Sequence, residues 1–162
     1  DNPPFGYTSS ARAEENMVTL TVPVWKLSGS RKVQSTMELT VNYKLAASVA
    51  AIFDEIFALP EQFPIVQLKG FSYRTVRGPD LYDSTLLSHH SFGAAIDINK
   101  PYNLFYRNTD RRDTDSPYYI TQNVIDIFEK YGWYWGGNFA EGLDTMHFQY
   151  LGLDLSPEGA QS

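Results

Sequence analysis

Hydrophobic and polar residues alternate along this chain with two different periods, and the changes of period predict its elements. From Met17 to Trp25 apolar residues occupy every second position, which predicts a half-buried strand. A Ser-Gly-Ser turn at Ser28–Ser30 separates it from a second candidate strand over Thr36–Val41, and the two are expected to form a hairpin. Residues 1–15 are rich in proline, serine and charge, and are expected to form an extended arm.

The hydrophobic period becomes that of a helix in two places. Over Asn42–Leu59 apolar residues recur at helical spacing, with Asn42 as the expected N-cap and Pro60 as the stop. A second helix is expected over Thr121–Tyr131, and Gly132 follows it as a C-terminal signal.

Three further stretches are expected to be strands, and together the elements indicate a fold class. These stretches are Ile65–Tyr73, Gly93–Asn99 and Met146–Leu151. The resulting order, β-β-α-β-β-α-β without repeats or an internal linker, predicts an α+β fold with one mainly antiparallel sheet and helices packed against it. A single domain is expected over residues 16–155, followed by a C-terminal tail at 156–162.

Composition and charge narrow the range of partners. The chain has 162 residues, of which 43% are hydrophobic and 15% aromatic, enough for one ordinary globular core. Its net charge of −6 argues against nucleic acid and against attraction to an anionic membrane surface. The absence of cysteine excludes disulfides and cysteine-ligated zinc. No apolar run approaches the ~18 residues of a transmembrane helix, and the first residues carry no signal-peptide pattern.

All three histidines of the chain lie in two short motifs. The first, SHHSFGAAID, spans Ser88–Asp97, and the second, LDTMHFQY, spans Leu143–Tyr150. Histidine is the commonest neutral side-chain metal ligand, and a His/Asp/His set matches a catalytic zinc site that keeps one position open. The set of His90, Asp97 and His147 therefore predicts a metallohydrolase.

Hydrolysis at such a site also needs a proton acceptor and an electrophile. Asp144 lies three residues before His147, and we assign it as general base and later general acid, with Glu141 as the alternative. Arg74 is the leading candidate to neutralise the oxyanion of a tetrahedral intermediate, and Arg77 is its rival.

Each of these residues also has a purely structural interpretation. A lone histidine is more often a hydrogen-bonded core residue than a ligand, and it is the joint spacing of the motif that favours a metal site. His89 could replace His90 as ligand, although its side chain points the opposite way. Trp133 and Trp135 are more often core residues than a substrate platform. On the last strand, Gln149 shares a face with His147, which places it beside the expected metal.

The motifs resemble those of a known family. SxHxxGxAxD followed by DxxHF is similar to the zinc peptidases of bacterial cell-wall turnover, the VanY-like group of D-alanyl-D-alanine carboxypeptidases and L-alanyl-D-glutamate endopeptidases. This group shares its fold with the hedgehog signalling domain. The likeness extends to FSYRTVRG, AAIDIN and YGWYWGGNF, and spans roughly Val41–Tyr150.

The resemblance implies roles for individual residues. It implies one zinc ion bound by His90, Asp97 and His147. It further implies that Asp144 is the acid/base, that Arg74 steadies the substrate carbonyl, and that Ser88 supports the site through hydrogen bonding. The substrate-binding or supporting residues are expected to be Ser88, Gln149, Tyr73 and Trp135.

The expected activity is zinc-dependent hydrolysis of peptidoglycan stem peptides by a secreted or cell-wall-associated monomer. Aspartate in the base position, the MHF ending and the WGG stretch look more like the endopeptidase branch, so cleavage between L-Ala and D-Glu is expected. The alternatives are a D-alanyl-D-alanine carboxypeptidase and, from another class, a wall-binding module that keeps the metal without turnover. A serine hydrolase using Ser88 is disfavoured because no GxSxG turn is present.

Overall fold

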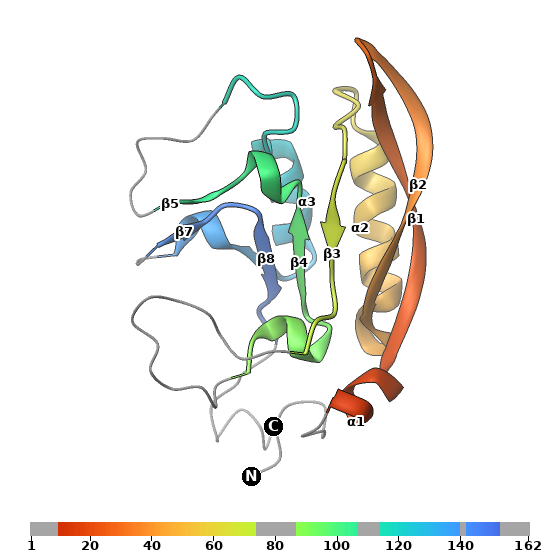
Figure 1. The fold of residues 1–162 in the computed structure, drawn as a ribbon, viewed down its shortest axis with the longest axis vertical. Coiled ribbons are helices and arrows are strands. Elements are labelled where there is room, and N and C mark those ends of the chain that lie inside the picture. Colours follow the sequence, from red (N-terminus) through yellow and green to blue (C-terminus); the bar gives the residue numbers. More distant parts are fainter. Residues whose placement is uncertain (1–9, 74–86, 107–113, 140–141, 153–162) are drawn as a thin grey trace.

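The computed structural model describes residues 10–73, 87–106, 114–139 and 142–152 of the chain (Figure 1). Its helices are α1 (Ser10–Glu15), α2 (Ala46–Ala58) and α3 (Gln122–Lys130). Its strands are β1 (Met17–Ser28), β2 (Arg31–Asn42), β3 (Leu68–Lys69), β4 (Ala95–Ile98), β5 (Phe105–Tyr106), β6 (Trp133–Trp135), β7 (Leu143–Asp144) and β8 (His147–Tyr150). Among the described residues, no helix is long and apolar enough to cross a membrane.

The strands form a central sheet and two smaller ones, and every strand pair is antiparallel. The central sheet has the order β3-β4-β8-β6, while β1 pairs with β2 and β5 with β7. Figure 1 shows the long β1–β2 hairpin and α2 on the β3 side of the central sheet, with β5 and β7 on the opposite side. The predicted α+β class is confirmed.

The hairpin extends further than the sequence pattern predicts. Its register runs from Met17 opposite Asn42 to Ser28 opposite Arg31. Backbone hydrogen bonds continue to the end of the hairpin, where the side chains are exposed or half-buried and none is fully buried. Trp25 ties the hairpin to α2, since its ring stacks on Phe57 at 4.8 Å and its indole N–H donates to the Phe57 carbonyl at 2.8 Å.

Both predicted helices are present. Asn42 caps the short 3₁₀ turn η2 (Tyr43–Leu45), accepting the Lys44 N–H at 3.0 Å, and this turn leads into α2. Helix α2 ends at Ala58, two residues before Pro60. Helix α3 ends just before Gly132, whose φ of 87° is the left-handed conformation that glycine favours.

Two predictions about individual segments are wrong. The strand expected over Ile65–Tyr73 shrinks to Leu68–Lys69, because the Val66 and Gln67 N–H groups donate to the Asn99 side chain instead of a ladder. Of the extended arm expected over residues 1–15, residues 1–9 lie outside the described residues and Ser10–Glu15 form a helix. Ala13 is fully buried there, so packing stabilises a helical segment that the polar composition of residues 1–15 does not predict.

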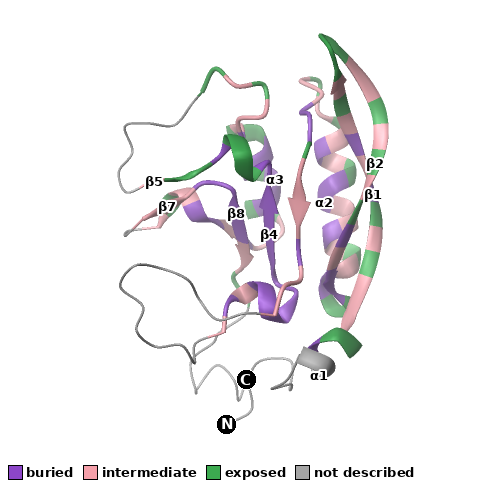
Figure 2. Ribbon diagram, viewed as in Figure 1, coloured by how far each residue is buried: buried purple, intermediate pink, exposed green. Residues whose placement is uncertain are grey.

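The core lies on one face of β4 and β8, and polar residues occupy the other. Phe148 of β8 stacks on Phe128 of α3, with ring centroids 3.9 Å apart, and Trp133 packs edge-on against the same ring. Figure 2 shows β4 buried along its whole length. Because side chains alternate across a strand, the residues between the core positions point to the opposite face, where Asp97 and His147 lie.

Candidate metal centre

His90 lies in the 3₁₀ turn η3 (His89–Phe92), which neighbouring side chains and main chain hold in place. The Ser88 hydroxyl accepts the His90 N–H at 3.2 Å. Gly93 ends the turn with a φ of 63°. The ring of His90 is completely buried, and its Nδ1 lies 2.7 Å from the Gly70 carbonyl oxygen.

Asp97 and His147 face each other across two neighbouring strands. They are directly paired in the β4–β8 register, so their side chains share one face of the sheet. Asp97 Oδ1 lies 3.1 Å from His147 Nδ1 and 3.3 Å from His90 Nε2. Two residues further along β8, Gln149 Oε1 lies 3.0 Å from His147 Nε2, as its expected place beside His147 requires.

The hydrogen bonds of the two rings determine which nitrogen atoms carry free lone pairs. An N–H at His90 Nδ1 donates to the Gly70 carbonyl, which leaves Nε2 as a lone pair facing Asp97. His147 has an oxygen partner at each ring nitrogen, Gln149 Oε1 at Nε2 and Asp97 Oδ1 at Nδ1, and the tautomer with its proton on Nε2 leaves the Nδ1 lone pair facing Asp97. His90 Nε2 is fully buried and has no hydrogen-bond partner among the described residues. With protons on His90 Nδ1 and His147 Nε2, three lone-pair donors converge on one point.

This arrangement fits a divalent metal ion. The candidate ligand atoms of His90, Asp97 and His147 all lie within 4.8 Å of one another. Tetrahedral zinc with bonds of about 2.0–2.1 Å places neighbouring ligand atoms about 3.3 Å apart, and the two distances to Asp97 Oδ1 are 3.3 and 3.1 Å. Two imidazoles and a carboxylate suit zinc, and the oxygen acceptors behind both rings are the usual orienting partners of zinc-bound histidines.

Without a metal, the same contacts shift the pKa values of these groups in opposite directions. Burial by itself raises the pKa of Asp97, but the contacts with His147 and His90 outweigh it and hold that pKa well below its usual value. Burial by itself lowers the pKa of His147, but the hydrogen bond and charge of Asp97, helped by the charge of Asp144, raise it. In the metal-free protein the site therefore favours an ionised Asp97 beside a positively charged His147.

Asp144 lies at the rim of this group. Its Oδ2 is 3.9 Å from His147 Nδ1, and its side chain keeps 30% of its exposure, so it can meet both solvent and a ligand. Gly136 makes this placement possible, because a Cβ there would lie 2.4 Å from the Asp144 carbonyl oxygen. The alternative base Glu141 and both candidate electrophiles, Arg74 and Arg77, lie outside the described residues.

Two other expected site residues, Trp135 and Tyr73, pack in or against the hydrophobic core. Trp135 is opposite Phe148 in the register, which turns its side chain to the core face, and its indole N–H donates to the Thr145 carbonyl at 2.9 Å. In this position Trp135 contacts the backbone two residues before His147 and does not face the converging atoms. Tyr73 is half-buried and packs against the hydrophobic core.

The structure also places three residues at the site that the sequence pattern does not indicate. Gly70 contributes its backbone carbonyl, a group that every residue has, so the residue type at position 70 does not indicate this role. The ring centroid of Phe139 lies 6.0 Å from that of His147. Phe105 is paired with Asp144 across β5 and β7 and remains 52% exposed. Single aromatic residues outside a periodic segment look the same in sequence whether they lie in the core or at a site.

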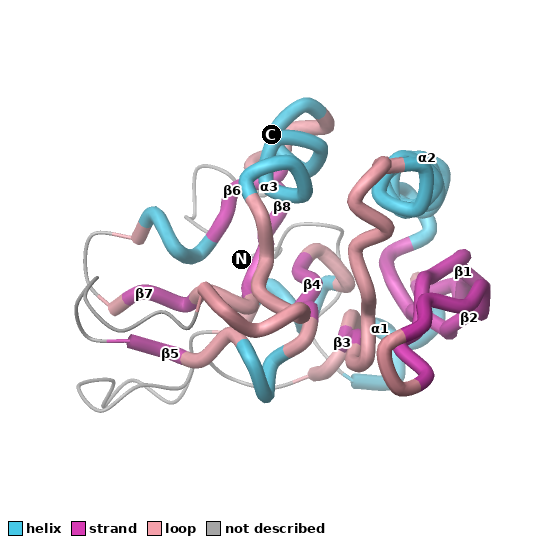
Figure 3. The backbone as a smooth tube through the Cα atoms, turned by 90° about the horizontal axis from the view of Figure 1, so that it is seen from above, coloured by secondary structure: helices cyan, strands magenta, loops and turns pink. Residues whose placement is uncertain are grey.

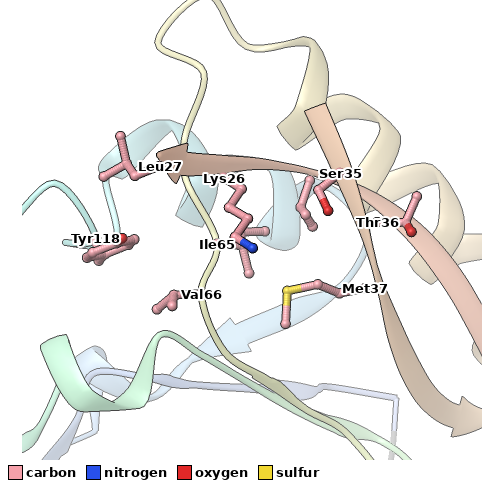
Figure 4. Close-up of a pocket in the computed structure, with 9 residues that line it drawn as sticks. Lys26, Leu27, Ser35, Thr36, Met37, Ile65, Val66 and Tyr118 are labelled. Carbon is pink, nitrogen blue, oxygen red and sulfur yellow. The ribbon is translucent and has the colours of Figure 1, made fainter. Parts of the chain in front are cut away.

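A separate cavity of about 280 Å³ lies between the hairpin and the chain that follows α2 (Figure 4). Its lining consists of Val24, Lys26, Leu27, Ser35, Thr36, Met37, Ile65, Val66 and Tyr118. None of the converging metal-site residues lines this cavity. His90, Asp97 and His147 come from η3, β4 and β8, and Figure 3 shows β3 between β4 and the hairpin that lines the cavity.

Comparison with known families agrees with this geometry. Residues 82–150 match a family model described as D-alanyl-D-alanine carboxypeptidase. Comparisons with curated proteins and with solved structures give no match. The matched residues begin before η3 and end with β8, so they include both motifs and the whole His/Asp/His group. Over this segment, which is less than half of the chain, the protein is similar to the D-alanyl-D-alanine carboxypeptidase family.

Proposed function

We propose that this protein is a zinc-dependent peptidase that hydrolyses the stem peptides of peptidoglycan, with residues 16–155 as its catalytic domain. The observation that carries the proposal is the convergence of His90 Nε2, Asp97 Oδ1 and His147 Nδ1 at one buried point. A buried carboxylate facing two lone pairs is costly unless a cation lies between them. The similarity of residues 82–150 to a carboxypeptidase family supports peptidase chemistry at this site.

His90, Asp97 and His147 would hold one zinc ion and leave a position open toward solvent. When bound, the ion supplies Lewis acidity that polarises the scissile carbonyl and lowers the pKa of water. The oxygen acceptors behind the rings, Gly70 O and Gln149 Oε1, keep each imidazole in the tautomer and orientation that this role requires.

Asp144 would move the proton. It is close enough to the ligands to accept a proton from the attacking water as the oxygen bonds to the carbonyl carbon. It then returns that proton to the amine nitrogen as the C–N bond breaks. We assign Arg74 to the negative charge that develops on the carbonyl oxygen, with Arg77 as the alternative.

Two aromatic side chains flank this catalytic group and would contact the substrate. In an antiparallel pair, directly opposed side chains share a face, so the exposed ring of Phe105 lies on the same side of β5–β7 as Asp144. Phe139 lies beside His147 and stacks on Tyr134, with ring centroids 5.6 Å apart. A small apolar group, such as the methyl of an alanine next to the scissile bond, suits a site of this kind.

Two bonds of the stem peptide are candidates. The aspartate in the base position and the MHF ending favour cleavage between L-Ala and D-Glu, which is the primary proposal. The description of the matched family favours removal of the terminal D-Ala instead. Either substrate lies outside the cytoplasm, so we propose that the protein acts there, as a secreted or wall-associated monomer.

Digestion of purified peptidoglycan, with and without a chelator, separates these possibilities. Mass spectrometry of the products identifies the bond: chelator-sensitive release of stem peptides that begin at D-Glu supports the endopeptidase, and free D-Ala supports the carboxypeptidase. Metal-loaded protein that releases no product from several wall chemistries contradicts both and leaves a non-catalytic wall-binding module.

A further inference from the structure

The end of strand β2 contacts the turn that carries His90. Asn42, the last residue of β2, is completely buried, and its side-chain Nδ2 donates to the Phe92 carbonyl at 3.1 Å. Its backbone N–H donates to the Gly93 carbonyl at 3.0 Å. One residue of the hairpin therefore holds two successive carbonyl groups of the η3 turn.

The hairpin and the turn are too close together at Gly93 to admit even one additional carbon atom. A Cβ added at Gly93 would lie 2.4 Å from the Asn42 nitrogen and 2.4 Å from the Met17 sulfur. Met17 and Asn42 are the paired residues at this end of the hairpin. The left-handed glycine thus lets the turn fit closely against the end of the hairpin, so a shift of one would move the other.

The same strand also supports the acceptor behind the His90 ring. The Thr40 carbonyl accepts the Phe71 N–H at 2.7 Å, and a Cβ on Gly70 would lie 2.1 Å from that carbonyl oxygen. The Gly70 carbonyl is the group that orients His90 Nδ1. Strand β2 therefore determines both the position of the turn and the direction of the ring.

We propose that Asn42 is a positioning residue for the metal ligand His90, and that the β1–β2 hairpin is a functional part of the metal centre. The hairpin precedes residues 82–150, the segment that matches the peptidase family model, so that match does not assign it this role. The inference rests on the proposed function only in that His90, Asp97 and His147 bind a metal. It does not depend on which peptide is cleaved.

Asn42→Ser and Asn42→Ala test the proposal against Val22→Ala as a control. Serine keeps an oxygen that can cap the Lys44 N–H but lacks the Nδ2–H group that reaches Phe92. Val22 is equally buried and belongs to the same hairpin, but it pairs with Met37, away from the Met17–Asn42 end. The control therefore destabilises the hairpin without removing a bond to the turn.

The measurements are zinc affinity, by competition with a chromophoric chelator, and the visible absorption spectrum of the cobalt-substituted protein. Both are taken at a temperature at which circular dichroism shows every variant folded. We expect both Asn42 variants to bind zinc about tenfold or more weakly and to change the cobalt spectrum. We expect Val22→Ala to lower the melting temperature while keeping the parent affinity and spectrum.

Two results would overturn the proposal, and they are distinguishable. Parent affinity and an unchanged cobalt spectrum in Asn42→Ser would make the residue purely structural, even if Asn42→Ala does not fold. A parent protein that binds no zinc would remove the metal centre itself. Tight zinc binding without peptidase activity would contradict the proposed function, and the Asn42 comparison would still decide the role of the hairpin.

Discussion

At the scale of single residues, the hydrogen bonds of His90 and His147 are more informative than the residue types. Each ring has one nitrogen bonded to an oxygen acceptor, and the other nitrogen faces Asp97 Oδ1. In a structural histidine both ring nitrogens are ordinarily satisfied, because an unsatisfied buried acceptor costs about 1–3 kcal/mol. At His90 Nε2, which is buried without a hydrogen-bond partner among the described residues, this cost is recovered when a cation binds, and that separates His90 from an ordinary core histidine.

Asp144→Ala separates proton transfer from metal binding. Asp144 is a neighbour of His147 and not one of the three converging ligands, so we expect the variant to retain its zinc. Turnover should fall by about 10²–10⁴-fold, the usual contribution of a positioned acid/base. Metal content by plasma mass spectrometry and stem-peptide hydrolysis are measured on the same sample. Near-normal turnover would move the role to Glu141.

Phe105→Ala tests the apolar contact beside Asp144. We expect kcat/KM for stem peptides to fall about tenfold through a higher KM, since the lost contact is worth one or two methylene groups, while zinc content stays unchanged. Val66→Ala is the matched control, because Val66 is similarly exposed at 48% but lines the separate cavity. Equal kinetics for Phe105→Ala and the parent enzyme would exclude Phe105 from the substrate site.

At the scale of elements, the strands that carry the site were the easiest to predict. The alternation over Gly93–Asn99 and Met146–Leu151 places Asp97 and His147 on the polar face, and the β4–β8 register then brings them together. The contact between Asn42 and the η3 turn could not be predicted, because it joins residues 50 positions apart through backbone groups. The shortness of β3 was equally hidden, since the Asn99 side chain takes the N–H groups that a ladder would use.

Gly136→Ala tests how the short 3₁₀ turn η6 (Gly136–Asn138) positions strand β7. The added Cβ would lie 2.4 Å from the Asp144 carbonyl oxygen and 3.0 Å from its Cβ, so the strand that carries Asp144 must move. We expect kcat to fall by about 10- to 100-fold, because a displacement near 1 Å is enough to disrupt a positioned group. Zinc affinity, measured by chelator competition, should remain that of the parent. An unchanged kcat would show that β7 tolerates the shift.

At the scale of the whole molecule, metal binding should reverse the dependence of stability on pH. In the metal-free protein, the pKa of His147 is raised above its usual 6.5 and that of Asp97 is lowered below its usual 3.8. The contribution of His147 is complete below pH 6.5 and is lost as pH rises through its raised pKa. The contribution of Asp97 is present above pH 3.8 and is lost as pH falls through its lowered pKa.

We therefore expect this pair to stabilise the metal-free protein most between these two usual values and less in alkaline solution. Zinc requires neutral histidines, so the rise in melting temperature on adding zinc should grow from pH 5 to pH 8. Melting curves across this range, with zinc and with a chelator, measure both trends. His147→Ala is the control and should lose the zinc effect at every pH. A zinc effect that shrinks as pH rises would contradict the ligand assignment.

The whole molecule also shows how a short family motif depends on the rest of the chain. The matched residues 82–150 contain the ligands, but Gly70 and Asn42, which hold His90, precede them. The central claim is that His90, Asp97 and His147 form one zinc site. Anomalous diffraction at the zinc edge, on crystals of the zinc-loaded protein, tests it most directly. We predict one strong peak within bonding distance of His90 Nε2, Asp97 Oδ1 and His147 Nδ1. A zinc-loaded crystal with no peak between these atoms would contradict the account.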